Sequence, residues 1–425
     1  MSAGRRANGE GSIYPYRDGM FAAYVWVSTP DGKRRRKYVY GATRELVHTK
    51  WLELHRVAAV GPVSTTTPTL SEYMTYWLRE VVAPSLKPKT AETYEMHHRL
   101  YIERGLGRKR LDRIIVRDVR TWLNRLAEQC QCCEQGKDAA RPEENRRCCA
   151  VGECCEQRLS RRTVLDVRAV LRSALSNAMA EELITRNVAT GIKMPRLRTR
   201  TIQPWSVEEA RRFLESARNE RDPFYPAYVL ILVLGLRRGE MLGLTWPMVH
   251  LDTAEVEIRY GLQRIGGRLV LGETKTQASD ALLPLPDICS TALRLQEKSQ
   301  AEAKADAGPF WVNSGHVFST RDGLPIDPRN FHRAFKARCV KAGVRPLPVH
   351  GTRHTCGSLL AALDVHPRVA MQILRHSKIA VTMEIYTHIP SELTRNALHK
   401  LGDSLERPRL SSLTRAADEP GTPLV

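Results

Sequence analysis

The stretch that decides the fold spans residues 235–244, which read GLRRGEMLGL and continue the apolar run 226–236. The apolar run predicts a buried helix, and Arg237 then stands at the start of a second, short helix. Glu240 follows three residues later, so its carboxylate can reach and orient the Arg237 guanidinium. The stretch therefore predicts an oriented arginine beside the core of a mainly helical domain.

Three other short motifs in the same half of the chain carry chemically active side chains. Lys275 lies between two threonines in a predicted hairpin, and the sequence HGTRH places His350 and Arg353 one helical turn apart. His376, in the sequence LRHS, precedes Tyr386 by ten positions. Each motif is weak by itself, because a His-x-x-Arg pair is more often a surface pair than a site.

Together and in this order, the four motifs resemble those of the tyrosine site-specific recombinase (phage integrase) family. Catalytic domains of that family carry a Gly-Leu-Arg-x-x-Glu box, a hairpin lysine, a His-x-x-Arg-His box, and a Leu-Gly-His box followed by a tyrosine. Here Arg375 replaces the usual glycine of the last box, and Gly351 stands where aspartate is common. Neither is a reacting group, so these departures bear on helix packing. The resemblance implies a cofactor-independent enzyme with the catalytic residues Arg237, Lys275, His350, Arg353, His376 and Tyr386.

The chemistry of phosphodiester cleavage suits these side chains. Negative charge spreads over the non-bridging oxygens, which the guanidiniums of Arg237 and Arg353 can clamp bidentately, while the histidines add hydrogen bonds or move a proton. Tyr386 is the candidate nucleophile, and a phenol with a pKa of about 10 needs a positive pocket to ionise at neutral pH. Lys275 is the candidate general acid for the leaving 5′ oxygen. Because the arginines supply the positive charge, this mechanism needs no metal.

Composition limits the partners of the chain. Its 425 residues carry a net charge of +20 and 42% are hydrophobic, so it forms real cores and attracts DNA, RNA or anionic membrane. The longest apolar run, 227–236, is about half of the ~20 residues that a membrane span needs, and residues 1–12 lack the apolar region of a secretory signal. We therefore expect a cytoplasmic protein with no membrane segment, whose ten cysteines are thiols.

The length and the residue patterns along the chain predict a multidomain α+β fold whose first domain contains a small sheet. Residues 11–41 alternate like three strands around two Asp-Gly turns, and a helix follows over about 44–58. The basic run 33–37 is either a solvated turn or a phosphate contact, and the basic, aromatic-rich surroundings favour the contact. With the resemblance, residues 1–62 become the predicted arm-type DNA-binding domain.

A second predicted domain, at 67–193, is helical and corresponds to the core-binding (SAM-like) domain of the family. Thr69 and Glu72 form a capping box at its start, after the linker 61–68. Apolar residues at helical spacing predict further helices over 90–102, 116–126 and 160–180.

The third predicted domain, the catalytic domain at 201–405, is mainly α with a small antiparallel sheet. It follows a second linker at 194–200, opens with the capping box of Ser206 and Glu209, and precedes a polar tail at 406–425. Strands are predicted around 254–260, 268–274 and 281–285, and helices over 286–305, 328–342, 350–363, 367–374, 379–386 and 391–405.

A cysteine-rich insertion interrupts the helical domain at 130–155, where seven of the ten cysteines lie. Its charged sequence cannot form a core. Cys130 and Cys133 with two cysteines of the later group match the ligand set of a tetrahedral structural zinc, while the alternative is a polar insertion with incidental thiols.

The predicted function is the integration and excision of a mobile element or prophage by site-specific DNA recombination through a covalent 3′-phosphotyrosine. The resemblance implies that a homotetramer acts on double-stranded DNA attachment sites, with a directionality factor as a further partner. Two alternatives remain open. One is a monomeric type IB topoisomerase that relaxes DNA, and the other is a catalytically inactive DNA-binding protein. The arm-like domain argues against the first, and the intact set of site residues argues against the second.

Overall fold

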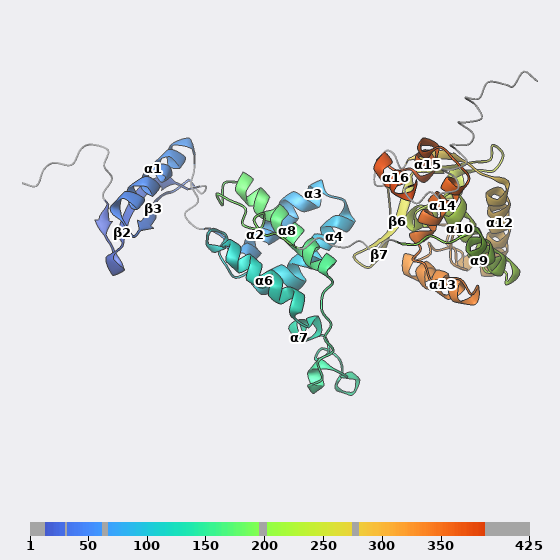
Figure 1. Cartoon of the computed structure of the whole chain (residues 1–425), viewed down its shortest axis with the longest axis horizontal. Helices are drawn as coiled ribbons and strands as arrows, with labels where there is room; N and C mark the ends of the chain where they lie inside the picture. The colour runs from blue at the N-terminus through green and yellow to red at the C-terminus, as the bar shows by residue number, and fades with distance from the viewer. Residues whose placement is uncertain (1–12, 30–31, 62–66, 195–201, 274–279, 387–425) are drawn as a thin grey trace, which may run out of the picture. The chain divides into compact units, whose positions relative to one another are not determined.

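The structure is a computed structural model that describes residues 13–29, 32–61, 67–194, 202–273 and 280–386. Internal contacts divide the chain into two units, Met1–Arg198 and Thr199–Val425, each with its own hydrophobic cores (Figure 1). The division falls inside the run that the sequence predicts as the second linker. Within the described ranges, every helix is too short or too polar to cross a membrane.

A three-stranded antiparallel sheet begins the first unit. The strands lie in the order β1 (Tyr14–Pro15), β2 (Phe21–Ser28) and β3 (Arg34–Gly41), and helix α1 (Arg44–Val60) packs against them. Both residues of the predicted turn after β1, Asp18 and Gly19, have positive φ angles of 59° and 71°, as a tight Asp-Gly turn requires. The small core consists of Ile13, Ala23, Val25, Val27, Val47, Trp51 and Leu54.

Strand β3 begins at Arg34, so most of the basic run 33–37 is strand rather than turn. Arg35 lies opposite Val27, and Arg36 lies opposite Trp26. The Arg36 guanidinium also sits over the Trp26 ring, 4.8 Å from its centroid. Backbone pairing with β2 therefore extends β3 into the basic run. The side chains of Arg34, Arg35 and Arg36 remain exposed.

The helical domain is built around helices that continue one another through π-helical turns. Helix α2 (Leu70–Trp77) passes through η2 (Leu78–Val82) into α3 (Ala83–Ser85), and α4 (Pro88–His97) passes through η3 (His98–Ile102) into α5 (Glu103–Leu106). Helices α6 (Val116–Glu128) and α8 (Arg161–Ala180) complete the core. The apolar residues at helical spacing within 116–126 and 160–180 are buried on one face of α6 and α8, as their spacing predicts: Val119, Trp122, Leu123, Leu126, Val164, Val167, Leu171, Ala174 and Ala178.

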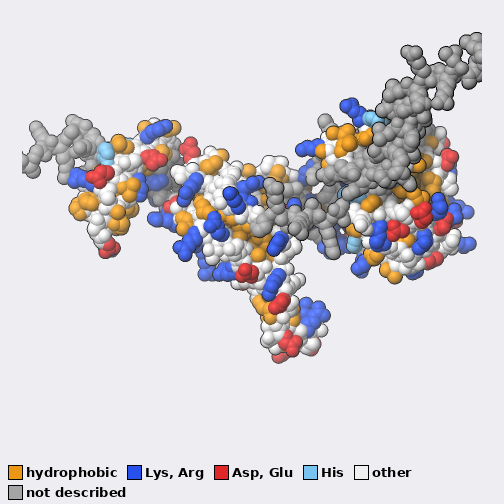
Figure 2. Space-filling model, viewed as in Figure 1, with side chains coloured by type: hydrophobic (Ala, Val, Ile, Leu, Met, Phe, Trp, Pro, Cys, Tyr) orange, Lys and Arg blue, Asp and Glu red, His pale blue; other side chains and the backbone are white. Residues whose placement is uncertain are grey.

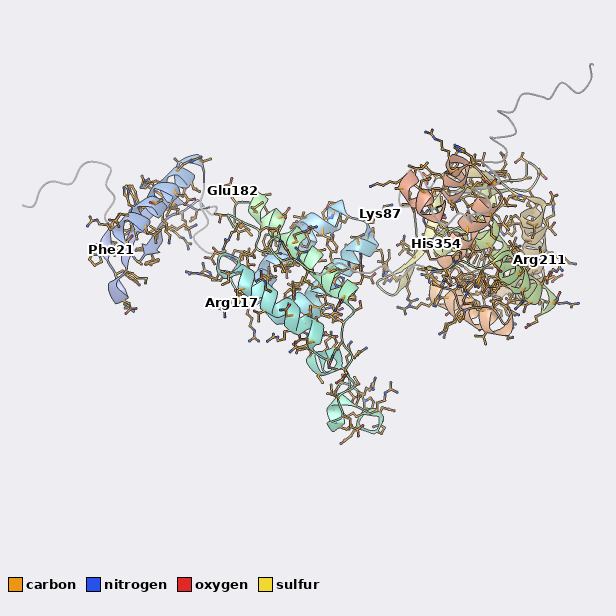
Figure 3. The ribbon with its side chains drawn as sticks, in the orientation of Figure 1. Phe21, Lys87, Arg117, Glu182, Arg211 and His354 are labelled. Carbon is orange, nitrogen blue, oxygen red and sulfur yellow. The ribbon has the colours of Figure 1, made fainter. Side chains whose placement is uncertain are left out.

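A capping box fixes the start of α2, and exposed arginines make the surface of this domain basic. The capping box is present, with Glu72 N donating to Thr69 Oγ1 at 3.3 Å and Thr69 N donating to Glu72 Oε2 at 2.8 Å. Arg117 and Arg120 on α6 are exposed, and Arg172 is exposed on α8. Figure 2 shows Lys and Arg side chains spread over the visible face of this domain, and Figure 3 labels Arg117 among them.

The cysteine-rich segment leaves the helical core between α6 and α8 as an appendage (Figure 1). It contains helix α7 (Gln131–Gln135) and the 3-10 turns Glu143–Asn145 and Cys149–Val151. The two ends of the segment meet, because the backbone N–H of Gln131 donates to the carbonyl of Gln157 at 2.8 Å.

The second unit packs helices around the long apolar helix that the sequence predicts. Helix α10 (Tyr225–Val233) is buried from Pro226 through Leu232, and Phe213, Phe331 and Phe335 pack around its Tyr228. The predicted capping box of Ser206 and Glu209 is present at the start of α9. The other helices of this unit are α9 (Val207–Asn219), α11 (Arg238–Leu242), α12 (Asp287–Ala307), α13 (Pro328–Lys341), α14 (Gly351–Ala362), α15 (Pro367–Leu374) and α16 (Ile379–Tyr386).

The described residues of the second unit form two small antiparallel sheets where the sequence predicts one. Strands β4 (Val249–His250), β5 (Glu255–Ile258) and β8 (Ala281–Pro284) form the first, and the hairpin of β6 (Tyr260–Ile265) and β7 (Arg268–Glu273) forms the second. The predicted strand 254–260 is thus wrong in its extent. It breaks at Arg259, and β6 is a separate strand that pairs with β7 through a turn at Gly266 and Gly267, both of which have positive φ. The predicted helix 391–405 lies outside the described residues.

Candidate active site

Arg237 stands at the N-cap of α11, where its predicted contact with Glu240 is present. Arg237 Nη1 donates to Glu240 Oε1 at 2.5 Å, and the Arg237 backbone N–H donates to Glu240 Oε2 at 2.9 Å. The Glu240 side chain is buried, whereas 36% of the Arg237 side chain is exposed. The carboxylate thus fixes an arginine whose outer edge remains accessible to a ligand.

Arg353 lies on α14 and is almost entirely buried. Its Nη1 donates to the carbonyl of Gly235 at 2.8 Å, and its Nε donates to Nε2 of His376 at 3.3 Å. Within the described part of the chain, its buried Nη2 has no hydrogen-bond partner. Burial, followed by the nearby charges of Arg237 and Arg375, lowers the pKa of Arg353 to about 9. The guanidinium still carries its charge at neutral pH, and among the described residues its hydrogen bonds go to a carbonyl and an imidazole rather than to a carboxylate.

Gly235 brings the first and third motifs together through its backbone. Its φ is +58°, and a Cβ atom there would lie 2.7 Å from Leu374 Cδ2 and 3.2 Å from Cys356 Sγ. A larger residue would be strained in conformation and would clash with α15. Glycine therefore lets the chain pass close to α14 and α15 and aim its carbonyl at Arg353.

Arg375 has a role that the sequence analysis missed. It ends α15 with a left-handed φ of 51°, a conformation that glycine adopts more readily than other residues. The side chain turns inward, is 2% exposed, and donates from Nη2 to Glu240 Oε2 at 2.7 Å. Glu240 therefore holds both Arg237 and Arg375. A charged residue at a helix end, directly between Leu374 and His376, was the signal in the sequence that could have indicated this role.

His376 is oriented by α14 on one side and α16 on the other. Its Nδ1 lies 2.9 Å from Oγ1 of the fully buried Thr382, and its Nε2 accepts from Arg353. Burial first, and then the charges of Arg353 and Arg237, lower the pKa of His376 to about 4. The ring is therefore neutral at pH 7, and because Nε2 accepts a hydrogen bond, Nδ1 carries the proton.

His350 forms the N-cap of α14, as its predicted place one turn before Arg353 requires. Its ring stands at 89° to the ring of His354, with 5.4 Å between the centroids. Figure 3 labels His354 in the second unit. Burial lowers the pKa of His350, and the neighbouring His354, Arg353 and Arg237 lower it further. His350 thus lies in the same positive field as the two arginines.

The structure brings four of the six predicted residues, Arg237, His350, Arg353 and His376, into one site, and it describes no side chain for the other two. Lys275 lies outside the described residues, two positions after the end of β7. Tyr386 is the last residue of α16, which packs against α14 and α15. It stands one helical turn beyond Thr382, the residue that contacts His376.

Charge in this site is strongly unbalanced. The guanidiniums of Arg237 and Arg375 both form ion pairs with the buried carboxylate of Glu240, and the guanidinium of Arg353 lies close enough to interact electrostatically with all three groups. Burial alone would raise the pKa of Glu240, but the charges of Arg375 and Arg237 outweigh it and lower the pKa. The arrangement can therefore bind an anion with several oxygens and can stabilise negative charge as it develops.

The cysteine-rich segment gathers its sulfur atoms in two groups of potential metal ligands. Cys130 and Cys133 lie with Cys149 and Cys154, and all four sulfurs are within 4.8 Å of one another. This set matches the predicted ligand pattern of two early and two late cysteines. A second group under the same limit contains Cys132, Cys148, Cys149 and Cys155.

Comparison with known proteins agrees with this architecture. Residues 206–392 match the phage integrase family, and residues 69–127 match the phage integrase N-terminal SAM-like domain. A tyrosine recombinase XerC-like protein of Caldanaerobacter subterraneus subsp. tengcongensis is 28% identical over 393 residues, which cover 88% of this chain and 93% of that protein. An integrase of Saccharopolyspora erythraea is 25% identical over 452 residues, which cover 93% of this chain and 97% of that protein.

A solved structure has the same fold. The Tn1549 transposon integrase in complex with a circular intermediate DNA aligns with a TM-score of 0.61 and 20% identity, over 79% of this chain and 100% of that one. The family matches lie in both units, and the second contains the four motifs in their expected order. The chain belongs to the phage integrase family, the tyrosine recombinases that cut and rejoin DNA without a cofactor.

Proposed function

We propose that this recombinase integrates and excises a mobile element or prophage by cutting and rejoining DNA at attachment sites. The observation that carries the proposal is Arg353, a buried guanidinium beside Arg237 whose Nη2 has no partner among the described residues. A scissile phosphate is an anion that these two guanidiniums can bind together. Its two non-bridging oxygens match two guanidiniums that are held in place by protein contacts.

In the proposed reaction, each residue of the site has one task. Arg237 and Arg353 bind the non-bridging oxygens, and Tyr386 attacks phosphorus to form a 3′-phosphotyrosine while the 5′ oxygen leaves. Lys275 protonates that oxygen as it departs, and the reverse steps rejoin the strands. His376 is neutral, so it acts through hydrogen bonds and keeps Arg353 in place. His350 adds a hydrogen bond to the phosphate.

The remaining parts of the chain supply DNA binding and assembly. We assign residues 1–62 to arm-type DNA, residues 67–193 to the core site, residues 201–405 to catalysis, and residues 406–425 to a tail. The exposed arginines of β3 and α6 support the first two assignments. The active form is a cytoplasmic homotetramer on two DNA sites, in which a directionality factor chooses between integration and excision.

We further assign a structural zinc site to the Cys130–Cys155 segment. The support is the predicted pair Cys130 and Cys133, which lies with two later cysteines in one group of four sulfurs. Four thiolates fill a tetrahedral zinc site completely, so a metal here stabilises the fold and takes no part in strand cleavage.

The test is covalent capture of the protein on a nicked suicide substrate that contains its attachment site. Wild type should form an adduct, and Tyr386→Phe should bind the same DNA with unchanged affinity but form none. Tyr225→Phe, at the start of α10, is the matched control and should form the adduct. An adduct from Tyr386→Phe would remove this tyrosine as nucleophile. Relaxation of supercoiled plasmids that lack the site would instead indicate the topoisomerase activity.

A further inference from the structure

All seven cysteines of the appended segment belong to two groups of sulfur atoms that share one member. The first group is Cys130, Cys133, Cys149 and Cys154, and the second is Cys132, Cys148, Cys149 and Cys155. Cys149 is common to both. Two tetrahedra that share one corner have seven corners in total, so the number of cysteines equals the number that two fully coordinated ions with one shared ligand require.

The distances between the sulfur atoms fit coordination of one ion by each group. The Cys133–Cys154, Cys130–Cys149 and Cys132–Cys148 sulfurs are each 3.8 Å apart, and the Cys149–Cys155 sulfurs are 3.7 Å apart. The sulfurs of Cys130 and Cys155, which belong to different groups, are also 3.8 Å apart, so the two groups are in contact. With a Zn–S bond of about 2.3 Å, the edge of the tetrahedron is about 3.8 Å. A disulfide would need about 2.05 Å, and all seven are free cysteines. The sulfurs are therefore spaced like ligands of zinc and not like disulfide partners.

The segment has no apolar core that could hold it together. Between residues 130 and 158 the buried residues are Gln131, Cys132 and Asp138, and the hydrophobic core of the domain stops at the flanking helices. A folded segment of this length without a core needs crosslinks. The grouped thiols are the side chains on it that can provide them.

The backbone is arranged to present the cysteines to one another. Gly136, with φ of +63°, ends helix α7, which carries Cys132 and Cys133, and Gly152, with φ of +89°, ends the 3-10 turn Cys149–Val151. Asp138 joins these two elements. Its buried carboxylate accepts the backbone N–H of Cys148 at 2.9 Å and of Ala150 at 3.1 Å.

We infer that the segment binds two zinc ions in one cluster, with the thiolate of Cys149 bridging them and three further cysteines bound to each ion. Zn-bound cysteines are thiolates, so loading the cluster releases the seven thiol protons to solvent. Each ion has four sulfur ligands and no open position, and the cluster is therefore structural. This inference extends the single structural zinc proposed above, and its success or failure does not depend on the recombinase reaction.

The experiment measures chelator-resistant metal in the full-length protein, purified under reducing conditions, by elemental analysis and native mass spectrometry. We expect two zinc ions per chain. Cys133→Ser and Cys148→Ser each remove a ligand of one ion and should each retain one zinc. Cys149→Ser removes the shared ligand and should retain none. Cys339→Ala changes a buried cysteine of the second unit and should retain two zinc ions.

Cadmium-113 magnetic resonance of the wild-type protein gives a second test, which does not depend on the folding of any variant. After replacement of zinc by cadmium-113, two resonances should appear, each split by coupling to the other ion through the shared sulfur. One zinc per chain in wild type, or none, would overturn the inference, as would bound iron. Two unsplit cadmium resonances, or a folded Cys149→Ser that retains as much zinc as Cys133→Ser, would overturn the bridging role of Cys149.

Discussion

Replacing Arg353 with methionine should stabilise the second unit while it abolishes DNA cleavage. Burial lowers the pKa of Arg353 from 12.5 to about 9. Because a pKa difference of one corresponds to about 1.4 kcal/mol, the buried charge lowers the free energy of unfolding by at most about 5 kcal/mol. Arg353→Met also leaves the buried Gly235 carbonyl without its donor, at a cost of about 1–3 kcal/mol. We expect a net gain of about 2 kcal/mol, because apolar side chains often replace buried charges favourably.

Scanning calorimetry of the full-length protein measures this gain as a shift in the melting temperature of the second unit. For a domain of this size, about 2 kcal/mol corresponds to an increase of about 4–8 °C. Sulfate or phosphate should raise the melting temperature of wild type, because either anion adds negative charge beside Arg353 and Arg237. The same anions should have little effect on Arg353→Met, since the charge that they stabilise is gone.

Arg338 provides the matched control, because it is equally buried but fully paired. It donates from Nε to Asp222 at 2.7 Å and forms an ion pair with Glu220 at 2.8 Å. Burial alone would lower the pKa of Arg338, but these two carboxylates outweigh it and raise the pKa. Arg338→Met should therefore destabilise the unit by about 3–5 kcal/mol. If Arg353→Met lowers the melting temperature as much as Arg338→Met does, the buried charge of Arg353 does not destabilise the folded unit, contrary to the prediction.

The Lys275→Ala variant should cleave ordinary DNA ~10²–10⁴-fold more slowly than wild type. It should cleave a substrate with sulfur as the bridging 5′ atom almost as fast as wild type, because a thiolate leaves without a proton. Arg237→Ala should gain nothing from that substrate, and equal rescue of both variants would exclude Lys275 as the acid. Deletion of residues 1–62 should remove footprints at arm-type sites and leave weak, salt-sensitive footprints at the core site; an unchanged footprint would refute the arm assignment. The pKa of His376 is about 4 in the folded protein and about 6.5 unfolded, so the unfolded chain binds more protons between these values and stability is lost as the pH is lowered through that range. In urea unfolding, His376→Gln should lose less stability over that range than wild type, and identical pH profiles would contradict the assigned shift.

Features that depend on neighbouring residues in the sequence were predictable. The capping boxes at Thr69 and Ser206 and the contact of Arg237 with Glu240 each join residues three positions apart, so their spacing contains the information. Periodicity likewise identified the buried faces of α6 and α8.

Features that depend on distant contacts were not predictable from the sequence. Arg375 was interpreted as a departure that affects packing, because its partner Glu240 lies 135 positions earlier and no local pattern joins them. Strand β6 was missed because one residue, Arg259, separates it from β5, and only pairing with β7 distinguishes the two strands. The sequence showed that seven cysteines are clustered, but the sharing of Cys149 by two groups needs coordinates.

The meeting of the two ends of the cysteine-rich segment has a consequence for how this chain could have arisen and how it can be rebuilt. The hydrogen bond between Gln131 and Gln157 closes the segment at its base, so the chain leaves α6 and re-enters α8 at nearly the same point. An insertion or excision between these two residues thus alters a loop and leaves the helices on both sides in register. Ancestral recombinases could acquire such a segment in one genetic event without a redesign of the DNA-binding helices. A protein engineer can by the same logic exchange it for another small domain whose ends lie close together.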